Sequence, residues 1–139
     1  MNNLKGCYSH NTDDWKTPAL LYEKFMQAGF IDPCPYQSKE DNLNKIYHAK
    51  LFINPPYSKL KEWTEFIFRN RHNEVFLLIP ARTDTKYFHK LLELKPHIIF
   101  IKGRLHFNDS GSAPFPSIML HFNNQIFPTY SKGEYDFTK

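Results

Sequence analysis

The sequence has few of the residues that build metal, disulfide and redox sites. Its two cysteines, Cys7 and Cys34, form neither a disulfide framework nor a zinc-binding C-x-x-C pair. Its seven histidines show no H-E-x-x-H motif and no paired ligand spacing, so we expect no metal site. Unpaired cysteines are typical of a reducing compartment, and the sequence therefore predicts a cytoplasmic protein, located in a bacterial host if a phage encodes it.

Glycine-rich loops, nucleophile motifs and long hydrophobic runs are also missing. The five glycines form no G-x-G after the first expected strand, and neither a P-loop nor G-x-S-x-G occurs. The commonest signatures of NTPases and serine hydrolases are thereby excluded. The longest apolar runs, such as residues 75–80, are too short to span a bilayer, and the polar start does not resemble a signal peptide. We expect no membrane association.

The composition is that of one globular domain with a basic middle. The 139 residues suffice for a single core, which predicts one domain over residues 1–139. The net charge is +4, and residues 59–104 carry ten Lys and Arg against five Asp and Glu, whereas residues 1–50 carry six of each. This excess suits an acidic partner such as nucleic acid, but a solvated basic surface would explain it equally well.

Helical and strand patterns alternate through the first hundred residues, and strands dominate afterwards. Helices are expected to begin near Thr17, which can act as a cap before Pro18, near Ser58, and near Asp84. Short apolar runs predict strands at residues 30–32, 51–53, 75–79, 97–102, 105–107 and 117–122. The order predicts an α/β fold whose sheet is mostly parallel, with antiparallel strands at the C-terminal end.

Ligands of such sheets bind beyond the carboxyl ends of the strands, which singles out Asp32, Asn54 and Pro80. Asn54 opens the turn Asn54-Pro55-Pro56-Tyr57, which directly follows the buried strand at 51–53. The Asn54 amide oxygen and the Pro55 carbonyl can accept the two N–H groups of a planar exocyclic amine. The two prolines fix the backbone, and Tyr57 offers a face on which a base can stack. The turn therefore predicts a site for a flat amine.

Each of these features has an ordinary structural explanation. Pro-Pro is a common chain terminator after a strand, Asn is a common turn residue, and a tyrosine can simply pack. The four residues together at the end of an apolar strand, with a helix following, favour the functional interpretation.

The turn resembles the signature of amino methyltransferases, and most of the chain is similar to the small phage-type DNA N6-adenine methyltransferases. Further segments of similarity fall in the family's order, at residues 15–18, 32–34, 78–85, 103–107 and 113–117. The resemblance implies a reduced class I methyltransferase sheet of Rossmann-like type. It also implies S-adenosylmethionine as the small-molecule methyl donor, and N6 of a flipped-out DNA adenine as the acceptor, with Asn54, Pro55, Pro56 and Tyr57 at the catalytic site.

The resemblance also assigns roles outside the turn. Trp15, Thr17 and Pro18 match a motif that holds the methionine end of the cofactor, and Asp32 matches the acid beside it. Arg82, Lys86, Lys102 and Arg104 lie in or near matched segments and can contact DNA phosphates, although exposed charge explains a single lysine equally well.

Two alternatives remain open at this level. Another planar amine, such as RNA adenine, cytosine N4 or a protein glutamine, would also suit an Asn-Pro-Pro-Tyr turn. The chain could instead be a catalytically inactive methyltransferase fold that binds nucleic acid. The sequence alone leaves the oligomeric state and the target sequence undetermined.

Overall fold

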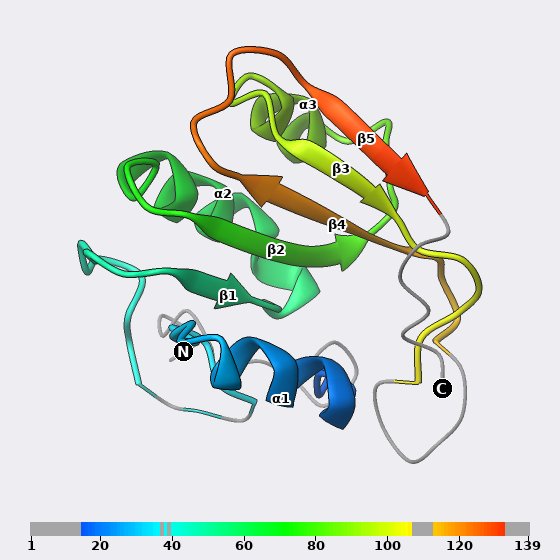
Figure 1. The fold of residues 1–139 in the computed structure, drawn as a ribbon, viewed down its shortest axis with the longest axis horizontal. Helices are drawn as coiled ribbons and strands as arrows, with labels where there is room; N and C mark the ends of the chain where they lie inside the picture. The colour runs from blue at the N-terminus through cyan, green and yellow to red at the C-terminus, as the bar shows by residue number, and fades with distance from the viewer. Residues whose placement is uncertain (1–14, 37, 39, 107–112, 133–139) are drawn as a thin grey trace.

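A computed structural model describes residues 15–36, 38, 40–106 and 113–132, in which five strands form one mixed sheet with helices on both faces (Figure 1). The helices are α1 (Ala19–Gln27), α2 (Leu60–Arg69) and α3 (Lys86–Leu92), and a short 3-10 turn, η1 (Tyr57–Lys59), precedes α2. The strands are β1 (Leu51–Ile53), β2 (Val75–Pro80), β3 (His97–Phe100), β4 (Ser117–Phe122) and β5 (Thr129–Lys132).

The strand order is β1-β2-β4-β3-β5, and the pairings decide which strand ends share an edge. β1 pairs parallel with β2 and β3 pairs parallel with β5, whereas β4 is antiparallel to both β2 and β3. Four strands therefore run in one direction, and β4 alone opposes them. The carboxyl ends of β1, β2 and β3 meet at the same edge of the sheet, where β4 begins.

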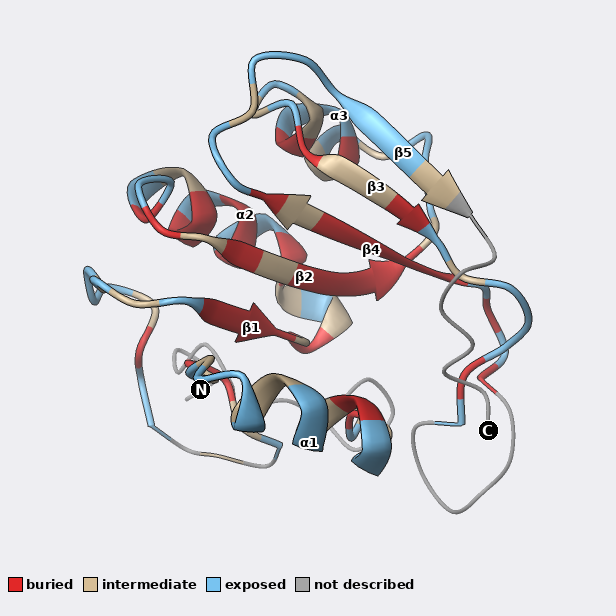
Figure 2. Ribbon diagram, in the orientation of Figure 1, coloured by how far each residue is buried: buried red, intermediate tan, exposed pale blue. Residues whose placement is uncertain are grey.

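Alternating side chains divide the core into two layers. Leu51, Ile53 and Leu77 face α2 and α3, where they pack with the buried Trp63 and Phe66 of α2. Residues between them in the strands, among them Phe52, Leu78 and Met119, face the opposite side and pack with Leu21 of α1. Figure 2 shows that β1, β2 and β4 are largely buried, while β5 is exposed. This alternation is typical of a sheet covered on both faces.

The α/β class and most of the expected elements are confirmed, but the sheet is not mostly parallel. Two of its four strand pairings are antiparallel; β4, late in the chain, is antiparallel as expected but lies inside the sheet, and β5 after it is parallel to β3. The expected strand at residues 30–32 is reduced to a single parallel bridge between Ile31 and Leu51. The segment cannot continue because Pro33 has no N–H and Asp32 instead accepts the Cys34 amide.

Other details differ as well, and the strand expected at residues 97–102 ends at Phe100. α1 begins at Ala19 with Pro18 at the cap position and no side-chain cap, so the capping role expected for Thr17 is wrong. Ser58 lies within the 3-10 turn rather than capping α2, which begins at Leu60. Leu105 and His106 form no strand, and Phe107 lies outside the described residues. None of the helices in the described ranges has the length and apolar character that a membrane crossing needs.

Candidate active site

The edge of the sheet where β1, β2 and β3 end collects most of the predicted site residues. Asn54 directly follows β1, Arg82 lies just beyond β2, and Lys102 and Arg104 follow β3. These side chains come from segments far apart in the sequence. Parallel strands bring them to one edge because their carboxyl ends point the same way.

The Asn54 amide is fixed by three hydrogen bonds. Its Nδ2 donates to the Trp15 carbonyl oxygen at 2.7 Å and to the Thr17 hydroxyl at 3.0 Å. A backbone carbonyl can only accept, so it sets the orientation of the amide and turns Oδ1 the other way. Oδ1 accepts the Tyr57 hydroxyl at 3.2 Å. Thr17 thus serves the Asn54 side chain rather than the start of α1.

The rest of the turn forms a rigid base under Asn54. Pro55 and Pro56 are buried, and Tyr57 is half-buried. Burial raises the pKa of the Tyr57 phenol well above its ordinary value, so this hydroxyl stays protonated and remains a donor at neutral pH. Two prolines in sequence restrict the backbone, and the turn holds its shape without a ligand.

A cavity of about 460 Å³ lies beside this turn. Four predicted residues line it, namely Trp15, Thr17, Asp32 and Asn54. The other lining residues are Lys16, Ala19, Tyr22, Glu23, Cys34, Pro35 and Tyr36. Its volume falls within the range of small-molecule sites, and its mixture of aromatic and acidic side chains suits a partly apolar cation. Pro18 and Tyr57 are not among the lining residues.

The acid of this cavity has perturbed electrostatics. Asp32 is half-buried, and burial raises the pKa of its carboxyl from 3.8 to about 6. Two hydrogen bonds oppose the rise, one from the Cys34 amide at 2.8 Å and one with the Tyr22 side chain. Burial together with this carboxylate raises the pKa of Tyr22 to about 12. Asp32 is ionised at neutral pH at an energetic cost, which a cationic ligand would offset.

Phe115 joins the cavity wall to the turn, and the sequence interpretation gave it no role. Its ring lies edge-on to both Trp15 and Tyr57, with centroids 5.4 Å apart in each pair. It is 8% exposed and precedes β4, whose first residue pairs with Pro80 at the end of β2. The signal available in the sequence was its place in the Ala113–Ser117 segment of resemblance. Only the fold shows which rings it contacts.

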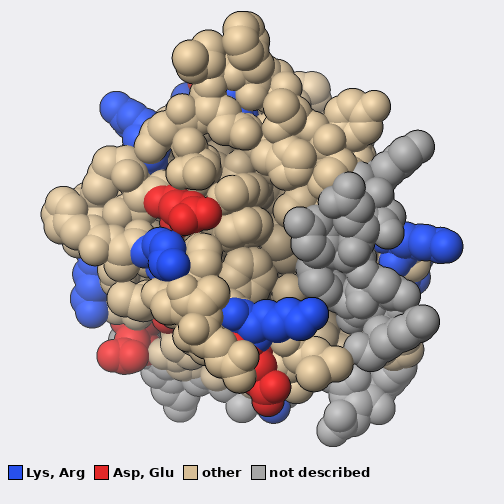
Figure 3. Space-filling view, viewed as in Figure 1, with Lys and Arg blue, Asp and Glu red and all other residues tan. Residues whose placement is uncertain are grey.

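The four cations assigned to DNA are all exposed. Arg82 lies on the connection from β2 to α3, Lys86 is the first residue of α3, and Lys102 and Arg104 follow β3. On the face seen from the α1 side, basic and acidic side chains lie scattered around a largely uncharged centre (Figure 3). Within the described ranges, no three His, Cys, Asp or Glu side chains gather where they could hold a metal ion.

An α/β sheet with a ligand-sized cavity beside a strand-end Asn-Pro-Pro-Tyr turn suits the class of amino methyltransferases. The sequence model of the DNA N-6-adenine-methyltransferase (Dam) family matches residues 7–117, and the chain belongs to this family. It is therefore an adenine-specific DNA methyltransferase, and membership implies a methyltransferase fold, S-adenosylmethionine as methyl donor and DNA as substrate. A search of curated proteins found no match.

Proposed function

We propose that the protein methylates N6 of a DNA adenine held at the Asn54–Tyr57 turn, with S-adenosylmethionine in the cavity beside it. The observation that carries this proposal is the fixed Asn54 amide. Its nitrogen is held by Trp15 and Thr17, two residues of the cavity wall, and its oxygen, which now accepts the Tyr57 hydroxyl, would accept an N–H from a substrate amine instead.

The chemical problem is that the N6 lone pair of adenine is delocalised into the ring. Two acceptors, Asn54 Oδ1 and the Pro55 carbonyl oxygen, would draw the two N–H groups and favour tetrahedral geometry at nitrogen. The buried prolines hold these acceptors in place before the substrate arrives, so little reorganisation is needed during reaction. No general base is required, because N6 would carry a positive charge once the new N–C bond has formed, and its acidic proton would then pass to water.

Access to N6 requires the adenine to leave the duplex. Unstacking costs a few kcal/mol, and stacking on an aromatic face recovers roughly 1 to 3 kcal/mol. Tyr57 supplies that face, and its ring is supported from the side by Phe115. The Tyr57 hydroxyl would yield its bond with Asn54 Oδ1 to the incoming N6 group.

The cavity supplies the donor side of the reaction. When bound, S-adenosylmethionine supplies a methyl group on a positively charged sulfur that is ready for in-line transfer. The Asp32 carboxylate suits the cationic methionine end, Trp15 and Thr17 line the adjoining wall, and Pro18 stands at the cap position of α1 beside them. The fit rests on the acid, the aromatic lining and the volume of the cavity.

DNA contacts are proposed for Arg82, Lys86, Lys102 and Arg104, which are exposed at or near the strand-end edge. Such contacts position the DNA without reading its sequence. We propose that one domain performs both binding and catalysis, with any sequence preference arising from loops around this edge.

The Asn54→Ala variant tests the proposal. Because the amide is assigned to the transition state, kcat is expected to fall at least a hundredfold while the dissociation constant for DNA stays within about threefold. Steady-state kinetics with a DNA-binding assay measures both quantities. An equal loss of affinity and rate would assign Asn54 to ground-state binding instead.

Two rival functions have different signatures. Methylation of RNA adenine, cytosine N4 or glutamine would place the methyl label in a different product. An inactive nucleic-acid-binding module would bind DNA without binding S-adenosylmethionine, which isothermal titration calorimetry detects directly. The lined cavity beside Asn54 favours the enzyme over the module.

A further inference from the structure

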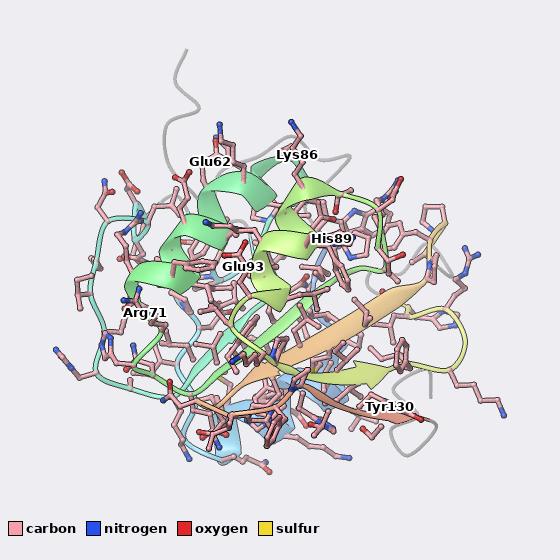
Figure 4. All side chains as sticks on the ribbon, turned by 90° about the horizontal axis from the view of Figure 1, so that it is seen from above. Glu62, Arg71, Lys86, His89, Glu93 and Tyr130 are labelled. Carbon is pink, nitrogen blue, oxygen red and sulfur yellow. The ribbon has the colours of Figure 1, made fainter. Side chains whose placement is uncertain are left out.

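A second cavity in the described part of the chain lies away from the proposed active site. It is a groove of about 670 Å³ between α2 and α3, on the sheet face opposite α1 (Figure 4). Lys61, Arg69, Lys86 and Lys90 line it together with a single acid, Glu65. Thr64, Phe68 and Tyr87 complete its lining. The groove is therefore strongly basic, whereas the face seen in Figure 3 is not.

The groove begins beside the proposed base site. Lys61 lies in the first turn of α2, directly after the 3-10 turn that contains Tyr57, and Lys86 is the first residue of α3. Figure 4 shows Lys86 at the same end of the helix pair as Glu62 of α2, extending away from the sheet. Tyr87 in the groove is close enough to Tyr57 to raise its pKa further, after the larger effect of burial. The proposed base site and the groove therefore lie next to each other, at the junction of η1 and α2.

We propose that this groove holds the backbone of the DNA that flanks the target adenine, with Lys61 and Lys90 contacting its phosphates. The inference rests on the proposed function, because it needs the target adenine at Tyr57. It extends the DNA contacts from the strand-end edge onto α2 and along α3, to residues that no sequence motif had marked.

The charges and contacts of the groove favour a phosphate backbone over an acidic polypeptide. Within the described residues, the Lys61 side chain makes no hydrogen bond or ion pair, and Lys90 Nζ lies 3.8 Å from Oε1 of the exposed Glu93. The Lys90 ammonium lies over the Phe68 ring, 4.8 Å from its centroid, on this aromatic part of the groove lining. An amphipathic acidic segment would need that surface for an apolar anchor, whereas a phosphate chain needs only the ammonium groups.

The test compares two double variants that lose the same charge. Lys61→Gln/Lys90→Gln removes the groove cations, and Lys24→Gln/Lys95→Gln removes exposed cations from α1 and from the loop before β3. Affinity for a duplex of about 20 base pairs is measured at several salt concentrations. The groove variant is expected to bind about tenfold or more weakly near 0.1 M salt, with a salt slope smaller by roughly 1.5 to 2. The control is expected to stay close to the unmodified protein.

Equal DNA binding by the two double variants would overturn the inference. It would also be overturned if the groove variant lost binding to polyglutamate, used as an acidic polypeptide probe, while its DNA affinity matched that of the control. Photocrosslinking of the unmodified protein to phosphate-tagged DNA gives a second measurement that needs no variant, with crosslinks expected on α2 and α3. The Asn54→Ala kinetics in parallel separate the two proposals, because retained turnover there would refute the proposed function whatever the groove binds.

Discussion

At the scale of single residues, Asn54 and Thr17 show how one contact changes an interpretation. The sequence of Thr17-Pro18 before an amphipathic helix is a good start signal, and it predicted a capping threonine. In the fold the Thr17 hydroxyl accepts from Asn54 Nδ2 instead. The partner lies 37 positions away, so no local pattern could have revealed it. The Asn54 turn could be recognised as a candidate site from the sequence, because its four residues are consecutive.

Asp32 makes stability depend on pH. Its folded pKa of about 6 exceeds the ordinary 3.8, so the folded state binds the proton more tightly than the unfolded chain does. This group's stabilising contribution is complete below about pH 4 and is lost as the pH rises to about 6, a change of roughly 3 kcal/mol. The free energy of unfolding of Asp32→Asn should therefore be higher than that of the unmodified protein at pH 7.5. The two free energies should converge near pH 4. Urea unfolding across this range measures the difference.

Cofactor affinity should move in the opposite direction. Ionised Asp32 suits a cationic ligand, so affinity for S-adenosylmethionine should rise as the pH passes about 6, and Asp32→Asn should flatten that dependence. Calorimetry at pH 5 and pH 7.5 gives both values. A pH-independent affinity in the unmodified protein would remove Asp32 from the cofactor site.

Phe115 is expected to act as a positioning residue. Phe115→Leu removes edge-on contacts with Trp15 and Tyr57, each worth about 0.5 to 1.5 kcal/mol, and loosens the ring on which the adenine would stack. We expect kcat to fall on the order of tenfold, with thermal stability reduced as well. Phe122→Leu is the matched control, since Phe122 is also buried but lies at the opposite end of β4. Equal kcat values for the two variants would show that Phe115 only fills the core.

At the scale of elements, the buried Asn70 ties the segment before β1 to the end of α2. Its Oδ1 accepts the Tyr47 amide at 2.7 Å, and its Nδ2 donates to the Lys45 carbonyl at 3.1 Å. Asn70→Ala leaves these backbone groups without their partner and should lower the free energy of unfolding by about 2 to 3 kcal/mol. The exposed Asn44→Ala serves as control and should change it by less than about 0.5 kcal/mol. Denaturant unfolding measures the free energy of unfolding of both variants. Similar values would show that the Asn70 hydrogen bonds do not stabilise the contact between these segments.

The elements divide into those that a local pattern predicts and those that need a partner. β2 and β4 are apolar runs with clear stops, and both were predicted almost to the residue. β5 was missed because Thr129–Lys132 contains one large apolar residue, Tyr130, and it is exposed. This strand exists through pairing with β3, where His97 bonds the hydroxyls of Thr129 and Ser131 at 2.6 and 3.0 Å. Such a contact cannot be read from β5 alone.

At the scale of the whole molecule, the α/β class followed from the order of elements, but the position of β4 did not. Strand direction depends on how each connection crosses the sheet, and periodicity carries no information about that. The result matters for function, because β4 begins at the edge where β1 and β2 end and brings Phe115 to the Asn54 turn. Phe115 and the Asn54 turn belong to segments of family resemblance that are far apart in the sequence, and the position of β4 brings them together.

The central claim is that the Asn54 turn directs a methyl group onto adenine N6 in DNA. The most direct measurement is nucleoside analysis of DNA after reaction with S-adenosylmethionine labelled in its methyl group. We expect label in N6-methyladenine with the unmodified protein and almost none with Asn54→Ala. Label in N4-methylcytosine, RNA or protein, or undiminished N6-methyladenine with Asn54→Ala, would contradict it.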